Sequence, residues 1–274
     1  MSDIVLTAGV RANLLQLQST AATITNTQSK LATGKRVNSA LDNPINFFTA
    51  QGLSNRANDL SNLLDSTSTA INTIQAANNG ITSITKLVQS AQALVSQAQQ
   101  TSDTTIRAGL ATQYNAIRGQ IDQLAGDSGF NGINLLDSTN SSNLTVVLNE
   151  KGTSSVTVNA VDFTSAGALA INNAANNFAA SADITAASTD LTAALTTLRS
   201  QAQAFGSSLS TVQIRQDFTK ATINTLQTGA DALTLADSNE EGANLLALQT
   251  RQQLSTTALS LASQASQAVL RLFG

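Results

Sequence analysis

The stretch that decides the fold is LTAALTTLRSQAQAFGSSLSTVQIRQDFTKATINTLQTGADAL, residues 191–233. Its seam positions are separated alternately by four and three residues from end to end. They are Leu191, Leu195, Leu198, Ala202, Phe205, Leu209, Val212, Gln216, Thr219, Ile223, Leu226, Ala230 and Leu233. This spacing is typical of helices that pack lengthwise on one another. The sequence therefore predicts one long packed helix, in which the polar Gln216 fixes the register.

The same spacing recurs on the N-terminal side of this stretch. It runs from Leu53 to Ile81, slips register and continues through Ile84 to Val95. It predicts a helix over about 45–100, roughly 80 Å long at about 1.5 Å per residue. Pro44 marks its start, because the residue before a proline is disfavoured in helices. A shorter helix is predicted from Ile106 to Leu124. The two helices provide packing partners for the stretch at 191–233.

The middle of the chain changes its period. Apolar residues alternate at Leu144, Val146 and Leu148, and again at Val156 and Val158, around an Asn-Glu-Lys-Gly turn. Alternation on both sides of a turn sequence predicts a β-hairpin. The segment 163–190, rich in Ala, Asn and Ser, is ambiguous.

The two ends of the chain carry weaker, small-residue patterns between Ser, Thr and Gln. The N-terminal seam contains Val10, Leu14, Leu17, Ala21, Ile24 and Leu31, with Gln28 as a polar interruption, and Gly34 offers a helix stop. The last segment carries Ala247, Leu254, Leu261, Ala265, Ala268 and Leu272. Such seams bury little apolar area against an ordering cost of about 1–2 kcal/mol per residue. We infer that the ends are poorly ordered alone and gain order when neighbouring subunits cover them.

These patterns predict a mainly α fold: a long antiparallel helical rod or coiled coil with a small β-hairpin in the middle of the chain. The expected segments are 1–42, 43–138, 139–185, 186–236 and 237–274. Aromatic residues make up 3% of the chain, so we expect thin helical seams and no thick core with aromatic anchors.

Composition excludes several classes of function. The chain has no His and no Cys, which removes the common nucleophilic triads and the usual zinc sites. We therefore expect no enzymatic activity, no cofactor and no metal. We expect the adjacent Glu240 and Glu241 to lie at a helix N-terminus, where carboxylates suit the helix dipole. The net charge is −3 with scattered Lys and Arg, which argues against nucleic acid. The sequence contains no run of about 18 apolar residues, so it predicts no membrane-spanning helix.

Three collinear motifs resemble those of one family. Residues 31–43 read LATGKRVNSALDN, residues 130–136 read FNGINLL, and the tail contains ALQ, QQL and ALSLA before VLRLF. Together they resemble bacterial flagellins, in a short form without large variable outer domains.

The resemblance implies a structural, non-enzymatic role with these expectations. Residues 1–42 and 237–274 would form the inner tube of a helical homopolymer, the flagellar filament, through Val10, Leu14, Leu17, Ala21, Ile24, Leu31, Leu254, Leu261, Ala265, Ala268 and Leu272. Segments 43–138 and 186–236 would form the outer domain around the hairpin and variable segment. The partners would be other copies, the cap and hook–filament junction proteins, the flagellar type III export apparatus and an export chaperone, and the subunit would be secreted. Alternatives are a hook–filament junction protein or a non-flagellar coiled-coil interaction rod.

Overall fold

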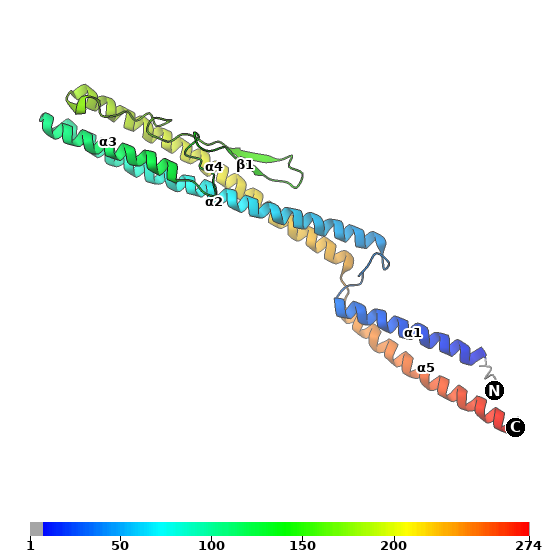
Figure 1. Cartoon of the computed structure of the whole chain (residues 1–274). Coiled ribbons are helices and arrows are strands. Elements are labelled where there is room, and N and C mark those ends of the chain that lie inside the picture. Colours follow the sequence, from blue (N-terminus) through cyan, green and yellow to red (C-terminus); the bar gives the residue numbers. More distant parts are fainter. Residues whose placement is uncertain (1–7, 274) are drawn as a thin grey trace. The chain divides into compact units, whose positions relative to one another are not determined.

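The chain is mainly helical, with five long helices and one two-stranded antiparallel hairpin. This computed structural model describes residues 8–273, with side chains described for 9–265, 267 and 268. The order is α1 (Ala8–Thr33), α2 (Pro44–Gln100), α3 (Thr104–Asp127), β1 (Leu144–Val147), β2 (Ser155–Val158), the short 3₁₀ helix η1 (Ala175–Phe178), α4 (Ser181–Thr234) and α5 (Ser238–Phe273). The predicted fold class is therefore confirmed in its helices and its hairpin (Figure 1).

The chain divides into two compact units. One contains residues 1–55 and 225–274, and the other contains residues 56–224. We call them the terminal unit and the central unit. The five segment boundaries expected from the sequence concern functional regions, and they stay a prediction.

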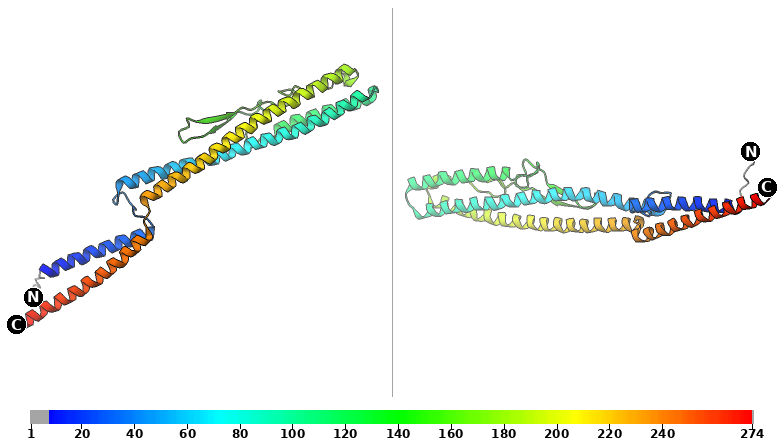
Figure 2. Two further views of the ribbon diagram at one scale, coloured as in Figure 1. Left: turned by 180° about the vertical axis from the view of Figure 1, so that it is seen from behind. Right: turned by 90° about the horizontal axis from the view of Figure 1, so that it is seen from below.

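Long α-helices side by side form the central unit. In both views of Figure 2, the central parts of α2 and α4 run next to each other. Ile74, Ile84 and Val88 of α2 are fully buried, as are Leu191 and Val212 of α4. The predicted seams of both helices are therefore confirmed. Gln216 lies half-buried in the α4 seam, and its Nε2 donates a hydrogen bond of 2.9 Å to Ser68 Oγ.

Helix α3 begins differently from the predicted pattern. Ile106, expected as its first apolar contact, is 54% exposed, while the neighbouring Arg107 is only 9% exposed. The guanidinium of Arg107 donates to the carbonyls of Ala98 and Thr101 at the end of α2 and of Ala179 before α4. The carbonyl of Ala98 lies in the last turn of α2, which leaves it without a helical partner and in need of a donor. The arginine therefore takes the inward position.

The predicted hairpin is confirmed. Strands β1 and β2 are antiparallel, and Leu144 pairs with Val158 while Val146 pairs with Val156. Leu144, Val146 and Val158 are buried, and the residues between them in each strand are exposed or half-buried. The alternation places one face of the hairpin on the helices.

The expectation of a core without aromatic anchors is wrong for the central unit. Tyr114, Phe163, Phe178 and Phe205 are at most 1% exposed. The rings of Tyr114 and Phe178 meet edge to face, with centroids 5.4 Å apart, and burial raises the pKa of Tyr114 to about 12. Four rings in one cluster make a core rather than a thin seam.

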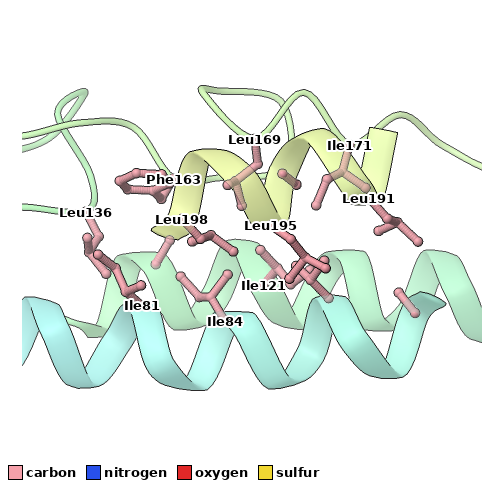
Figure 3. Packing of buried hydrophobic residues seen from close by; sticks show 14 of the residues in the cluster. Ile81, Ile84, Ile121, Leu136, Phe163, Leu169, Ile171, Leu191, Leu195 and Leu198 are labelled. Carbon is pink, nitrogen blue, oxygen red and sulfur yellow. The ribbon is translucent and has the colours of Figure 1, made fainter. Parts of the chain in front are cut away.

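The ambiguous segment supplies this thicker core. Phe163, Leu169 and Ile171 come from the connection after the hairpin. Figure 3 shows Leu169 and Ile171 above Ile121 of α3 and Leu195 of α4, and Phe163 toward Leu198. Buried residues in an irregular segment follow no regular spacing, so their burial could not be predicted from the sequence pattern. The connection thus covers the helices as a further layer.

Candidate functional site

The terminal unit contains a junction between two segments of the chain. One segment follows α1, and the other connects α4 to α5. Gly34, with φ of +67°, ends α1, and its carbonyl accepts from the Ala236 amide at 3.0 Å. Lys35 and Leu235 form an antiparallel bridge. The Arg36 amide donates to the Thr234 carbonyl at 2.7 Å. Main-chain hydrogen bonds therefore join segments that are about 200 residues apart in sequence.

Side chains complete this junction. Arg36 Nη2 donates to the carbonyls of Ala232 at 3.4 Å and Leu233 at 3.2 Å, in the last turn of α4. Asp237 Oδ1 accepts from the Asn239 amide at 2.8 Å and so caps α5. A cation at a helix C-terminus and a carboxylate at an N-terminus both complement the helix dipole. Glu240 and Glu241 lie in the first turn of α5, as the sequence predicts.

A turn at residues 38–42 follows the junction. The Asp42 carboxylate accepts from the amides of Asn38 at 3.0 Å and Ser39 at 2.9 Å, and from Ser39 Oγ. The backbone amides of Ser39 and Asn38 hold the pKa of Asp42 below its ordinary value. Hydrogen bonds to the charged form favour ionisation, so the turn is formed best with Asp42 deprotonated.

We predict that acid and the Asp42→Asn substitution both loosen this turn. Because the folded-state pKa is lowered, the stabilisation is fully present above the ordinary carboxyl pKa of about 4 and is lost as the pH falls through the lowered value. Amide hydrogen exchange at Asn38 and Ser39 should be several-fold faster in Asp42→Asn at neutral pH. Asp65→Asn, at an exposed position on α2, is the control, and equal exchange in both variants would contradict the prediction.

Helices α1 and α5 pack antiparallel in the terminal unit. Lys30 near the end of α1 forms an ion pair of 3.1 Å with Glu241 at the start of α5. The side of α1 that faces α5 carries half-buried or buried residues at intervals of three and four: Val10, Asn13, Leu17, Thr20, Ile24, Thr27 and Leu31. Only Ile24 among the described apolar residues of α1 is buried, at 8% exposed. The contact is therefore shallow and partly polar.

Helix α5 faces α1 with a stripe that does not contain Leu254 or Leu261. The half-buried positions are Glu241, Gly242, Leu245, Leu248, Gln252, Ser255, Leu259 and Ala262. None of the described side chains of α5 is buried. Packing between α1 and α5 within one chain therefore leaves much apolar surface of α5 uncovered.

The residues expected to form the polymerisation interface fall into two groups. On α1, Val10, Leu17, Ala21 and Leu31 are half-buried, Ile24 is buried and Leu14 is 38% exposed. On α5, Leu254 is 67% exposed, Leu261 is 62% exposed, and Ala265 and Ala268 are exposed. The side chain of Leu272 lies outside the described residues. The α5 group shares one outward face, which is free to meet another molecule.

Two exposed leucines were missed by the sequence analysis. Leu15 of α1 and Leu246 of α5 are each 67% exposed. Leu246 lies eight residues before Leu254, so both lie on one side of α5. Their apolar character was visible in the sequence, but they lie beside the predicted stripes. We call Leu14, Leu15, Leu246, Leu254, Leu261, Ala265 and Ala268 the outward apolar face.

Within residues 8–273, no cluster of three or more acidic side chains could hold a metal ion. No described helix is long and apolar enough to cross a membrane. The outward apolar face and the junction are the features of the terminal unit that lie on α1, α5 and the chain between them.

Comparison with known proteins supplies the family. Residues 7–141 match the sequence model of the bacterial flagellin N-terminal helical region, and residues 189–273 match the C-terminal helical region. The chain is 31% identical over 274 residues to flagellin FljM of Caulobacter vibrioides, with 100% of this chain and 99% of that protein covered. The chain belongs to the bacterial flagellin family. This is a family of structural proteins that polymerise into the filament of the bacterial flagellum.

Further relatives span the chain to different extents. The flagellin of Brucella melitensis is 28% identical over 283 residues, with 100% of this chain and 99% of that protein covered. The crystal structure of Bacillus cereus flagellin covers 58% of this chain and 88% of its own, with 21% identity and a TM-score of 0.48.

The flagellin matches coincide with particular elements. The N-terminal region covers α1, α2 and α3, and the C-terminal region covers most of α4 and all of α5. The motif at 31–43, by which the sequence resembles flagellins, is the segment that ends α1, bridges to Leu235 and forms the Asp42 turn. Its residue types therefore have a structural reason in this flagellin.

Proposed function

We propose that this flagellin assembles into the flagellar filament through the outward apolar face of α1 and α5. The main observation is that none of the described side chains of α5 is buried, and that its large apolar residues Leu246, Leu254 and Leu261 are 62–67% exposed. Exposed apolar patches of this kind mark contact surfaces. In a filament, neighbouring subunits would cover this face.

The weak pairing of α1 with α5 supports a requirement for other subunits. Ordering a residue costs about 1–2 kcal/mol, and apolar burial is the main term that offsets it. Between α1 and α5 that burial is small, since Thr20 and Thr27 are two of the three buried side chains described on α1. We propose that the two helices are poorly ordered in the free subunit and become ordered in the polymer.

The small side chains of the C-terminal part suit a crowded polymer core. Ala258, Ala265 and Ala268 alternate with Ser and Gln on exposed positions of α5. Small residues allow helix axes to approach closely, so several copies of α1 and α5 can share one core. The expected roles of residues 1–42 and 237–274 as the inner tube and of 43–236 as the outer region belong to this proposal.

The remaining partners follow from the same function. We propose that the subunit passes the flagellar export apparatus with or without an export chaperone, adds beneath the cap protein and meets the hook–filament junction proteins at the filament base. Its site of action is then extracellular. We also propose that it has no enzymatic activity. Full-length similarity to proteins named flagellin favours this role over a junction protein or an unrelated coiled-coil rod.

The test is assembly of the double variant Leu254→Ser, Leu261→Ser. Full burial of a leucine contributes about 1.5–3 kcal/mol. These two leucines are partly covered in the subunit and become buried on assembly, so replacing both should destabilise the polymer by about 3 kcal/mol. The critical concentration for seeded assembly should rise roughly 100-fold, at about 1.4 kcal/mol per factor of ten. Sedimentation and electron microscopy measure it.

The control is Gln249→Ser, Gln253→Ser, which changes two exposed polar residues of the same helix. It should assemble like the unmodified chain. Failure of the unmodified chain to form filaments from seeds would refute the proposed function. Assembly of the leucine variant at the normal concentration would refute the assigned surface.

A further inference from the structure

A second apolar surface lies just beyond the junction. Leu41 in the turn is 96% exposed, Ile45 is 78% exposed and Phe48 is 61% exposed. Pro44 begins α2, so Ile45 and Phe48 lie three residues apart on one side of its first turns. We call Leu41, Ile45 and Phe48 the turn patch.

The turn patch is held in place by its surroundings. Asp42 fixes the turn that carries Leu41 through its hydrogen bonds to the Asn38 and Ser39 amides. Asn43 Oδ1 accepts from the Asn46 amide at 3.0 Å and caps α2. The exposed side chains therefore stand on an ordered backbone, so little entropy is lost when a partner covers them.

A third apolar surface lies on α4 in the central unit. Ile214 is 66% exposed and Phe218 is 63% exposed, and their spacing of four places them on one side of the helix. The seam of α4 is buried at Val212 and Thr219, so its packing on the central unit leaves this pair outside. We call Ile214 and Phe218 the α4 strip.

The two surfaces stand out from the rest of the described chain. Outside α1 and α5, they are the places where bulky apolar residues more than three-fifths exposed lie three or four positions apart. The other exposed bulky residues outside those helices, Ile106, Phe130, Val147 and Leu235, are at most 54% exposed. Each of the two surfaces therefore needs a cover that the single chain does not give it.

The size and asymmetry of the two surfaces indicate a second copy of this chain as that cover. At about 200 Å² for a large apolar side chain, the turn patch and the α4 strip together expose roughly 700 Å². Stable interfaces bury about 1,200–2,000 Å², so this contact alone is too small to hold a dimer in solution. A contact between two different surfaces of identical chains leaves one surface free at each end, so it propagates as a helix unless its rotation closes a ring.

We propose that the turn patch of one subunit packs on the α4 strip of a neighbouring subunit in the filament. The proposal rests on the proposed function, because the contact needs the α1–α5 interface to bring the copies together. The turn patch follows the Lys35–Leu235 bridge and lies in the terminal unit, as the outward apolar face does. Monomers in solution would leave both surfaces uncovered.

The chain has no cysteine, so introduced pairs can be cross-linked without background. One protein carries Phe48→Cys and another carries Phe218→Cys, and both are diluted into an excess of unmodified subunits so that assembly is preserved. After oxidation, mass spectrometry counts disulfides between residues 48 and 218. We expect at least about tenfold more of them in filaments than in unassembled mixtures, because neighbours in a polymer have a high effective concentration.

The matched control pairs Ser54→Cys with Gln213→Cys, which are exposed positions on other faces of the same two helices. Filaments that form normally but give no more 48–218 disulfide than this control overturn the inference and leave the proposed function standing. Absence of filaments from the unmodified chain overturns the proposed function itself.

A second measurement does not depend on cross-linking. Phe218→Ser should raise the critical concentration about tenfold, since most of a phenylalanine's burial is lost from the polymer. Its unfolding transition should match that of the unmodified monomer, because the residue is exposed there. Gln213→Ser should assemble normally. A Phe218→Ser protein with normal assembly contradicts the proposed contact.

Discussion

A chain that ends at Asp237, without α5, is expected to remain folded and monomeric and to form no filaments where the full chain assembles readily. Removal of α5 takes away Leu246, Leu254 and Leu261 of the outward apolar face. It also leaves α1 without its partner helix. Both losses act on assembly, so we expect an all-or-none effect in seeded sedimentation and electron microscopy.

The truncated chain should stay folded because its main core is elsewhere. The large hydrophobic cluster runs from Ala70 to Val212 and lies within the central unit. The main unfolding transition should therefore keep its midpoint. Because α5 is poorly ordered in the free subunit, helix content by circular dichroism should fall by less than the 36 residues of α5. Filaments of the truncated chain, or its complete unfolding, would contradict this prediction.

Hydrogen exchange on the full chain gives the matching control. Amides of α1 and α5 should exchange rapidly in the monomer and slowly in the filament, whereas those of α2 near Ile84 should be protected in both. Deletion of α1 should abolish assembly in the same way. Monomers with fully protected terminal helices and no self-association would rule out assembly-dependent ordering.

The sequence predicted α4 well because it carries a single unbroken apolar stripe, and α2 because its stripe slips register only once, after Ile81. Every seam position from Leu191 to Leu233 is buried or half-buried. The break at Pro44 and the stop at Gly34 were also readable, because proline and glycine restrict or free the backbone locally.

The orientation of α5 could not be predicted from its own residues. The helix has two apolar stripes, one with Leu245, Leu248 and Leu259 and one with Leu254 and Leu261. Both stripes have helical spacing, so the spacing does not show which of them faces α1. The Lys30–Glu241 ion pair shows which side meets α1, and this pair joins residues 211 positions apart. Long-range contacts of that kind leave no trace in a local pattern.

The aromatic core was missed for a related reason. Phe163 and Phe178 flank an irregular connection, where a buried side chain is not repeated at any fixed interval. Their burial depends on the loop folding back on α3 and α4. The interface residues on α1 and α5 were chosen from their stripes. Their exposure on α5 agrees with the chosen role, which stays a prediction.

Replacement of Arg107 by methionine is expected to lower the unfolding free energy of the flagellin by about 3 kcal/mol, because buried carbonyls lose their donors. Arg107 Nε donates to Thr101 O at 2.7 Å and to Ala98 O at 3.2 Å, and Nη1 donates to Ala179 O at 3.1 Å. Methionine retains the apolar stem but none of these hydrogen bonds. Urea unfolding followed by circular dichroism measures the loss.

Lysine at the same position separates charge from geometry. Arg107→Lys keeps the positive charge beside the C-terminus of α2, but a single ammonium lacks the planar fork that reaches Thr101 and Ala179 together. We expect it to recover about half of the lost free energy, since a cation still complements the helix dipole. Complete recovery would show that charge alone explains the role of Arg107.

The control for both variants is Arg199→Met, at an exposed position of α4 in the same unit. An exposed substitution of this type should change the unfolding free energy by less than about 0.5 kcal/mol. If Arg107→Met behaves like this control, the three carbonyls have other donors and the arginine is not what joins α2, α3 and the start of α4. Since Arg107 belongs to the central unit, its variant should assemble normally at temperatures where it stays folded, which separates folding of the subunit from its assembly.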